Sequence, residues 1–289
     1  MSERLAVKKT YKLAIGGSFP RSESGRSYEV LDAKGRFLAN AAMASRKDAR
    51  DAVVAARKAY PAWSGATAYN RGQVLYRVAE MMEGRRAQFV DEVAAGEGVT
   101  RPRAERSVDE AIDRWVWYAG WADKIAQVVG SSNPVAGPYF DFSVPEATGV
   151  VAVLAPQGSS LLGLVSVLAP VVVSGNTAVV VASQQRPLPA ITLAEVLGTS
   201  DVPGGVVNVL TGRVGDIGPW LASHMDVNGL DLTGVTGHPD HARATARDCL
   251  HEIATLSGLR APLPEAPWTH GEPFERRLLA SLDALHALA

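Results

Sequence analysis

The spacing of apolar residues changes along the chain and marks the predicted elements. Two short apolar runs, residues 11–15 and 27–31, are each followed by a turn rich in Gly or Asp, which is typical of strands. From Ser45 onward the apolar residues recur every three to four positions, which indicates amphipathic helices. Ser45 with Asp48 resembles a capping box at the start of the first helix. Two further long helices are predicted at residues 69–96 and 107–129.

Three tryptophans gather in the last of these predicted helices. Trp115, Trp117 and Trp121 lie within seven residues of one another. Such a cluster can form a platform on which a ligand stacks, but large aromatic side chains more often fill cores. We therefore interpret this segment as a helix that packs on two sides.

The second half of the chain alternates apolar strands with helices. Strands are predicted at residues 150–155, 177–181, 206–210 and 229–232, and helices at 161–173, 189–197, 214–224 and 238–250. This alternation predicts an α/β fold with a doubly wound parallel sheet. Residues 161–181 are apolar enough to resemble a membrane span, but Pro170 and the Gly175-Asn176 pair divide them into two shorter elements. No membrane association is therefore expected.

Composition and charge exclude several classes of protein. Hydrophobic residues make up 47% of the 289 residues and charged residues 20%, as in globular rather than disordered chains. The formal net charge is −1, so no broad attraction to nucleic acid is expected. The single cysteine, Cys249, excludes an internal disulfide and a cysteine-based metal cage. A cytoplasmic location is predicted, because residues 1–12 lack the apolar core of a signal peptide.

Two segments carry apolar faces that need another surface to cover them. Residues 139–144 alternate, with Phe140, Phe142 and Val144 on one face, and are predicted to form half of an arm-like hairpin. A Pro-rich link precedes an amphipathic helix at residues 274–289. We expect this helix to dock on its own domain or on a partner chain.

Several motifs, taken in order, resemble those of the aldehyde dehydrogenase superfamily. Residues 201–212, D-V-P-G-G-V-V-N-V-L-T-G, resemble the family's P-x-G-V-V-N-V-V-x-G. Residues 173–180, V-S-G-N-T-A-V-V, resemble A-x-G-N-T-V-V, and residues 145–156 resemble E-P-x-G-V-V-x-x-I-x-P. Residues 231–234, D-L-T-G, stand where the family has F-T-G-S. The resemblance covers about residues 11–260.

The resemblance implies a Rossmann-like, NAD-binding-type α/β domain with N-terminal helices and an oligomerisation arm. We expect the N-terminal strands and helices at residues 1–129, the arm at 130–148, the Rossmann-like part at 149–260, and the Pro-rich link with the C-terminal helix at 261–289. Most of the family's catalytic domain would then be missing, so that the chain is a truncated member of the family.

The positions that carry catalysis in the family differ in this chain. Family members use an activated cysteine thiolate that attacks the aldehyde before hydride passes to NAD(P). Cys249 precedes the position expected for that nucleophile and is interpreted as a small buried helix residue. Gly158 stands where the family has an asparagine that donates to the oxyanion, and the adjacent Gln157 is expected to point elsewhere. Leu256 replaces the glutamate that activates water, and Glu252 is offset from it by four residues. No residue is therefore assigned as catalytic.

The cofactor positions are altered as well. The family's K-P-[AS]-E, whose lysine and glutamate hold the adenosine ribose, corresponds here to V-A-S-Q at residues 181–184, and Val235 replaces the serine of F-T-G-S. Backbone amides at the helix start after Gly212 can still receive a phosphate. We expect no NAD(P) binding or only weak binding, and no metal. Five residues remain as vestigial candidates for cofactor contact: Ser183, Gln184, Gly212, Gly215 and Gly234.

Together these changes indicate a non-catalytic family member. Our first hypothesis is a structural or regulatory subunit that binds a catalytic aldehyde dehydrogenase subunit in a hetero-oligomer, or a second copy of itself in a homo-oligomer, because an unpaired arm is an exposed strand edge. The second is an active NAD(P)-dependent aldehyde oxidoreductase whose chemistry has relocated. The third is a nucleotide-binding module that acts alone. No nucleic acid or membrane partner is expected.

Overall fold

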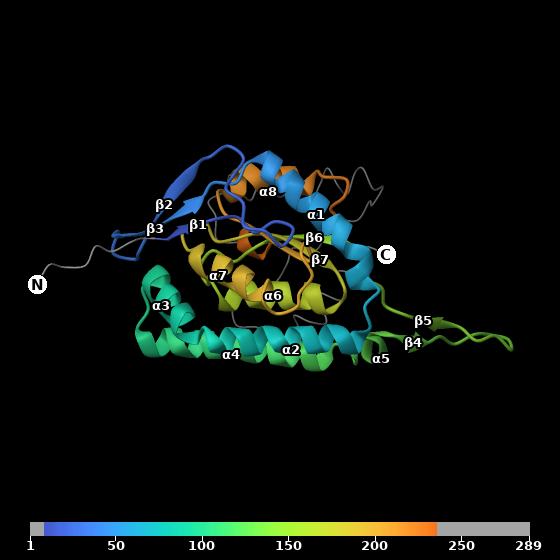
Figure 1. Cartoon of the computed structure of the whole chain (residues 1–289). Helices are drawn as coiled ribbons and strands as arrows, with labels where there is room; N and C mark the ends of the chain where they lie inside the picture. The colour runs from blue at the N-terminus through green and yellow to red at the C-terminus, as the bar shows by residue number, and fades with distance from the viewer. Residues whose placement is uncertain (1–8, 236–289) are drawn as a thin grey trace, which may run out of the picture.

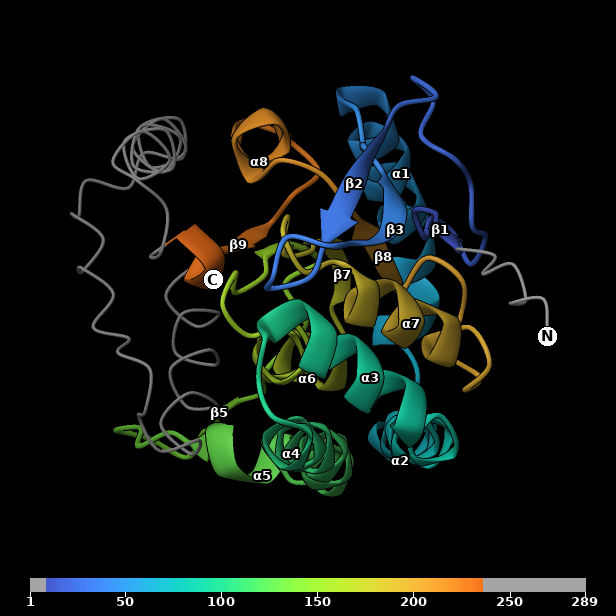
Figure 2. The same ribbon diagram turned by 90° about the vertical axis from the view of Figure 1, so that its left-hand side faces the viewer.

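A four-stranded parallel sheet lies at the centre of the protein (Figures 1 and 2). The computed structural model describes residues 9–235. The strands pair in the order β8-β7-β6-β9, and every neighbouring pair is parallel. This arrangement confirms the doubly wound α/β fold that the sequence predicts. The bounds of the strands are Val150–Leu154 for β6, Thr177–Val181 for β7, Val207–Leu210 for β8 and Gly229–Asp231 for β9.

Successive residues of the central strands enter two different cores. In β6, Val151 and Val153 belong to the larger core, while Val150, Ala152 and Leu154 belong to the smaller one. The larger core packs against α6 (Leu162–Val173) and α7 (Leu188–Leu197), and the smaller one against α1 (Arg46–Ser64) and α8 (Val214–Ala222). Figure 2 shows these helix pairs on opposite faces of the sheet. Both faces are covered, so β6 and β7 are apolar at nearly every position.

A second, three-stranded sheet lies beside the main one. Its order is β1-β3-β2, with bounds Thr10–Tyr11, Phe37–Ala42 and Ser27–Leu31 for β1, β3 and β2. The strand predicted at 27–31 is confirmed, whereas the run at 11–15 pairs only at its start and then makes isolated bridges at Ala14 and Ile15. The sequence does not predict β3, because its alanines have low strand propensity and give no clear alternation.

The long helix predicted at 69–96 is two helices, which corrects that prediction. They are α2 (Ala68–Gly84) and α3 (Arg86–Glu97), and Arg85 between them leaves the helical conformation with φ −113° and ψ 14°. Both helices bury the predicted apolar side in the same core, so the periodicity continues across the break. The first helix begins as predicted, since Ser45 and Asp48 form the capping box at the start of α1.

The tryptophan-rich helix packs into the larger core as interpreted from the sequence. It is α4 (Arg101–Trp121), which begins earlier than the predicted residue 107, and the short α5 (Ile125–Val129) follows as a separate helix. Trp115 is fully buried, and the half-buried Trp117 and Trp121 rings lie 5.2 Å apart between centroids.

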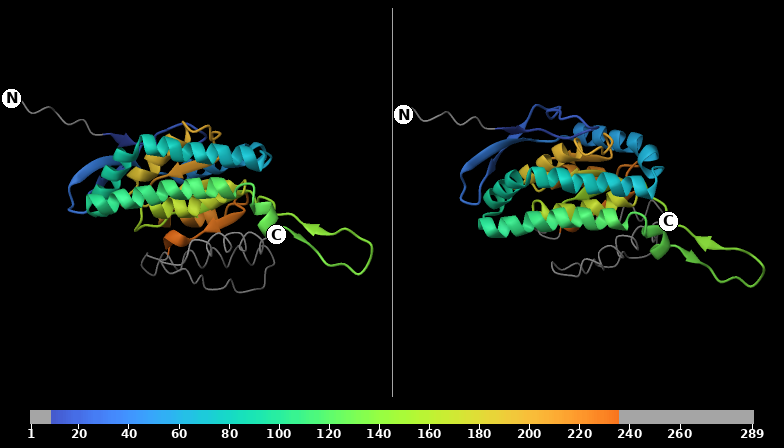
Figure 3. Two further views of the ribbon diagram at one scale, coloured as in Figure 1. Left: turned by 90° about the horizontal axis from the view of Figure 1, so that it is seen from below. Right: turned by 60° about the horizontal axis from the view of Figure 1, so that its bottom comes forward.

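The hairpin after α5 extends away from the body of the protein (Figure 3). Its strands β4 (Ser131–Ser132) and β5 (Phe142–Ser143) are antiparallel. The paired part is shorter than the predicted strand at 139–144, because only two residues on each side form the ladder. The hairpin therefore consists mostly of a long connecting loop.

The apolar segment at 161–181 divides into α6 and β7, as the Gly175-Asn176 break predicts. Between residues 9 and 235, no helix combines the length and the hydropathy that a membrane crossing requires. The helices predicted at 238–250 and 274–289, together with Cys249, Glu252 and Leu256, lie outside the described residues.

Candidate functional site

The loops that follow the four parallel strands meet at the carboxyl edge of the main sheet. Doubly wound sheets bind ligands at this edge, in the crevice where the chain reverses its direction across the sheet. Here the reversal lies between β6 and β9, because the chain runs outward from β6 through β8 and then returns to the other side. All five candidate residues come after β7, β8 or β9: Ser183, Gln184 and Gly212 lie in the loops, Gly215 lies in the first turn of α8, and Gly234 lies in a short 3-10 helix.

Ser183 and Gln184 form one cluster with Gln157, which follows β6. The Ser183 hydroxyl donates to the Gln157 carbonyl oxygen at 3.1 Å. The Gln184 backbone N–H donates to Gln157 Oε1 at 2.9 Å, and Gln157 Nε2 donates to the Ala155 carbonyl oxygen at 2.8 Å. The Gln157 side chain thus joins the ends of β6 and β7.

Gly158 supplies a carbonyl oxygen but no side-chain donor. That oxygen accepts a hydrogen bond of 2.6 Å from Arg186 Nη1. A Cβ built on Gly158 would meet no atom of the described residues within 4 Å. A side chain would therefore fit here, and glycine leaves the position without the amide donor that an asparagine would provide.

The loop after β6 is held to α3 by a residue that the sequence does not point to. Glu97 Oε1 accepts from the backbone N–H of Ser160 at 2.7 Å and from its hydroxyl at 2.8 Å. Glu97 and Ser160 are 63 residues apart, and Arg186 and Gly158 are 28 residues apart. No local spacing could have predicted either contact.

Gly234 lies against the end of β6. It belongs to the short 3-10 helix η1 (Thr233–Val235), which follows β9. A Cβ at Gly234 would overlap the carbonyl oxygens of Leu154 and Ala155. Glycine is therefore required for η1 to approach β6 at the point where the sheet reverses.

Gly212 and Gly215 lie at the start of α8, on the side of α1. Gly212 has φ +141°, and a Cβ there would lie 3.3 Å from the Ala44 backbone nitrogen. Gly215 is exposed and lines a pocket of about 350 Å³ together with Arg26, Arg46 and Trp220, among others. Gly212 therefore permits the close packing of the α8 start against Ala44, and Gly215 contributes to a surface pocket.

The end of β7 and the residues after it, 181–184, carry neither the lysine nor the glutamate of the ribose clamp that the family resemblance implies. Val181 is fully buried in β7, and the Ser183 hydroxyl is bonded to Gln157. Arg186 is the nearest cation along the chain, and it is bonded to the Gly158 carbonyl oxygen. Within residues 9–235, no group of three acidic, His or Cys side chains gathers to hold a metal ion.

Comparisons with known proteins agree on one family. The model of the aldehyde dehydrogenase family matches residues 19–258. Retinal dehydrogenase 2 of Gallus gallus is 33% identical over 237 residues, which cover 80% of this chain and 45% of that protein. The D-glyceraldehyde dehydrogenase (NADP(+)) of Thermoplasma acidophilum is 29% identical over 252 residues, which cover 87% of this chain and 51% of that protein.

The solved structures give the same result. The crystal structure of HpcC from Thermus thermophilus matches with a TM-score of 0.78 and 28% identity, over 84% of this chain and 47% of that one. The chain thus spans about half the length of these relatives. The order of the motifs, the doubly wound sheet and the matched segment all lead to one assignment: the chain belongs to the aldehyde dehydrogenase family.

Proposed function

We propose that this chain is a non-catalytic family member that acts as a structural or regulatory subunit and binds a catalytic aldehyde dehydrogenase. The family's activity is the NAD(P)-dependent oxidation of aldehydes. In this proposal the partner performs that activity, and the chain described here contributes a binding surface.

The loops at the carboxyl edge of the sheet support the non-catalytic part of the proposal. Gly158 has no side-chain amide to donate to an oxyanion, and the loss of one such donor costs about 2.7–4 kcal/mol of transition-state stabilisation. Gln157, Ser183 and Gln184 bond to one another rather than presenting a charged pair to a ribose. These two changes affect separate steps, cofactor binding and charge stabilisation.

The observation that carries the proposed partnership is the exposed apolar surface of the arm. The exposed fractions of Tyr139 and Phe140 are 77% and 85%, and Phe142 and Val144 are also exposed. The Phe140 and Phe142 rings lie 5.5 Å apart between centroids and form one patch. Burial of a large apolar side chain contributes about 1.5–3 kcal/mol. Several such side chains together can offset the cost of association.

A related chain is the partner that this surface fits best. The hairpin offers unpaired backbone groups beside its aromatic patch, so it is suited to a partner that presents both a strand edge and an apolar surface. The sheet and fold shared across the family supply such edges. We expect a catalytic aldehyde dehydrogenase to be preferred, and a second copy of this chain to be the alternative occupant.

The proposal is tested by measuring particle mass for the chain alone and after co-expression with a catalytic aldehyde dehydrogenase. We expect co-purification as a defined complex, and Phe140→Asp with Phe142→Asp should abolish it. Phe37→Asp is the matched control, because Phe37 is an exposed aromatic residue on β3, which lies at the end of the protein opposite to the arm (Figure 1). The proposal is wrong if the intact chain stays monomeric at tens of micromolar and does not co-purify with the catalytic aldehyde dehydrogenase. It is also wrong if the control variant disrupts the complex as strongly as the arm variant does.

A further inference from the structure

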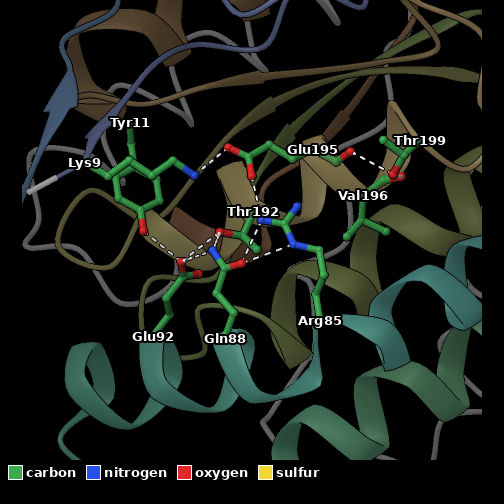
Figure 4. Close-up of polar contacts among 9 residues, drawn as sticks. All are labelled: Lys9, Tyr11, Arg85, Gln88, Glu92, Thr192, Glu195, Val196 and Thr199. Atoms are coloured by element: carbon green, nitrogen blue, oxygen red, sulfur yellow. Dashed lines mark hydrogen bonds and ion pairs between the residues drawn. The ribbon is translucent and has the colours of Figure 1, made fainter.

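A buried carboxyl group joins three elements that are far apart in the sequence. Glu92 on α3 is only 8% exposed. Its Oε1 accepts from the Tyr11 hydroxyl of β1 at 2.8 Å, from Thr192 Oγ1 of α7 at 2.8 Å, and from Gln88 Nε2 at 3.0 Å (Figure 4). Three donors therefore converge on one oxygen of the carboxyl group.

The second oxygen of Glu92 is in a different environment. Oε2 is buried and has no hydrogen-bond partner among the residues that the structure describes. An ionised carboxylate would hold negative charge on an oxygen without a donor, which is costly in an apolar interior. A neutral acid avoids that cost, because Oε1 then serves as the carbonyl acceptor and Oε2 carries the proton. Burial raises the pKa of Glu92, although its three hydrogen bonds oppose the rise.

Two nearby cations, Lys9 and Arg85, form ion pairs with a second carboxylate, Glu195 on α7. Lys9 Nζ lies 2.6 Å from Glu195 Oε1, and Arg85 Nη2 lies 2.7 Å from Oε2. Burial alone would raise the pKa of Glu195, but the bonds from Lys9 and Arg85 lower it overall. Tyr11 remains a donor, because its burial raises the pKa of its hydroxyl. The cluster thus favours one ionised acid, Glu195, and one neutral acid, Glu92.

Glu92 lies where β1, α3 and α7 meet, and the N-terminal segment at this point contacts both sheets. β1 pairs with β3 in the small sheet. The chain after β1 then bridges to β8 of the main sheet through Ala14 and Val209, and the Gly16 backbone N–H donates to Asn208 Oδ1 at 2.9 Å. A change at Glu92 therefore acts on the segment that connects the two sheets.

We propose that Glu92 is a pH-sensitive latch, which holds β1 against α3 and α7 in its neutral form and loosens this junction when it ionises. A carboxyl group whose pKa is raised by folding binds more protons in the folded state than in the unfolded state. Its stabilising contribution is complete below its unfolded pKa of about 4.3 and is lost as the pH rises through its folded pKa.

The test compares the unfolding equilibrium of the wild type with that of Glu92→Gln across this pH range. Glutamine keeps the shape of the neutral acid but cannot ionise. We expect the ratio of the wild-type unfolding constant to that of Glu92→Gln to rise about tenfold per pH unit above the unfolded pKa, and to level off above the folded pKa. Hydrogen exchange at residues 10–15, compared between the two proteins at each pH, should become faster in the wild type over the same range.

Glu195→Gln is the matched control from the same cluster. The pKa of Glu195 is lowered by folding, so its contribution is lost as the pH falls, which is the opposite direction. A ratio for Glu92→Gln that is independent of pH, or that falls as the pH rises, would overturn the proposal.

A measurement on the wild type alone keeps the proposal testable if Glu92→Gln does not fold. The carbonyl band of a protonated carboxylic acid in the infrared spectrum should persist above the pH at which exposed carboxyl groups have ionised. Absence of that band in the folded wild type would contradict the neutral Glu92.

Discussion

Gln157 turns its side chain back on to the sheet, and this single residue changes what the carboxyl edge offers to a ligand. It satisfies the Gln184 backbone N–H and the Ala155 carbonyl oxygen at the same time. The sequence predicted that Gly158 would lack a donor and that Gln184 would be a neutral replacement for glutamate. It could not predict the Gln157 contacts, because they depend on how the ends of β6 and β7 lie side by side.

From the residues at the end of β7, we expect NAD⁺ to bind weakly or not at all. Val181 and Gln184 leave the ribose without two charged partners, and each such hydrogen bond contributes about 1.5–3 kcal/mol. If the losses are additive, affinity falls by about a hundredfold to ten-thousandfold relative to a family member that keeps the clamp. Calorimetric titration of the purified chain checks this, with a catalytic family member as the positive control. A micromolar dissociation constant for this chain would refute the expectation.

Some helices and strands could be predicted from the local sequence, and others could not. The capping box at Ser45 and the buried strands β6 and β7 were predictable, because a side-chain cap and a continuous apolar run are local signals. The break at Arg85 was not, because α2 and α3 bury their faces in one core and Gly84 is the only nearby helix breaker. Strand β3 was missed because tertiary pairing decides its conformation, against the low strand propensity of its alanines.

Two glycines at the ends of neighbouring helices should respond in opposite directions to alanine. Gly98 ends α3 with φ +68°, and a Cβ there would overlap Ala33 Cβ. We expect Gly98→Ala to lower the free energy of unfolding by about 2–4 kcal/mol, from left-handed strain plus overpacking. Gly84 lies in α2 with open space around it, so Gly84→Ala should raise the free energy of unfolding by about 0.5–1 kcal/mol.

Denaturant unfolding of both glycine variants and the wild type checks this pair. Equal stability of Gly98→Ala and the wild type would contradict the close approach of α3 to the turn that contains Ala33. A destabilised Gly84→Ala would contradict the open helical environment assigned to that position.

At the scale of the whole molecule, the main sheet is covered on both faces, whereas the aromatic side chains of the arm are exposed among residues 9–235. The order of strands and helices from residue 150 onward predicted the doubly wound sheet, because alternating apolar strands and helices of this length rarely fit another architecture. The alternation of residues 139–144 predicted that Phe140 and Phe142 share one face of a strand. It did not predict that both side chains are exposed. We propose that a partner surface covers these two side chains, and the role of the arm in association stays a prediction.

Aldehyde oxidation by the purified chain tests most directly the proposal that the chain is non-catalytic. NADH or NADPH formation is followed by absorbance with aliphatic and aromatic aldehydes, beside a catalytic aldehyde dehydrogenase under the same conditions. We expect no aldehyde-dependent formation of reduced cofactor by this chain, alone or after Cys249→Ala. Steady formation that survives Cys249→Ala would show that the chemistry has relocated to other residues. Formation that Cys249→Ala abolishes would show that Cys249 is the nucleophile, and either result would contradict a non-catalytic subunit.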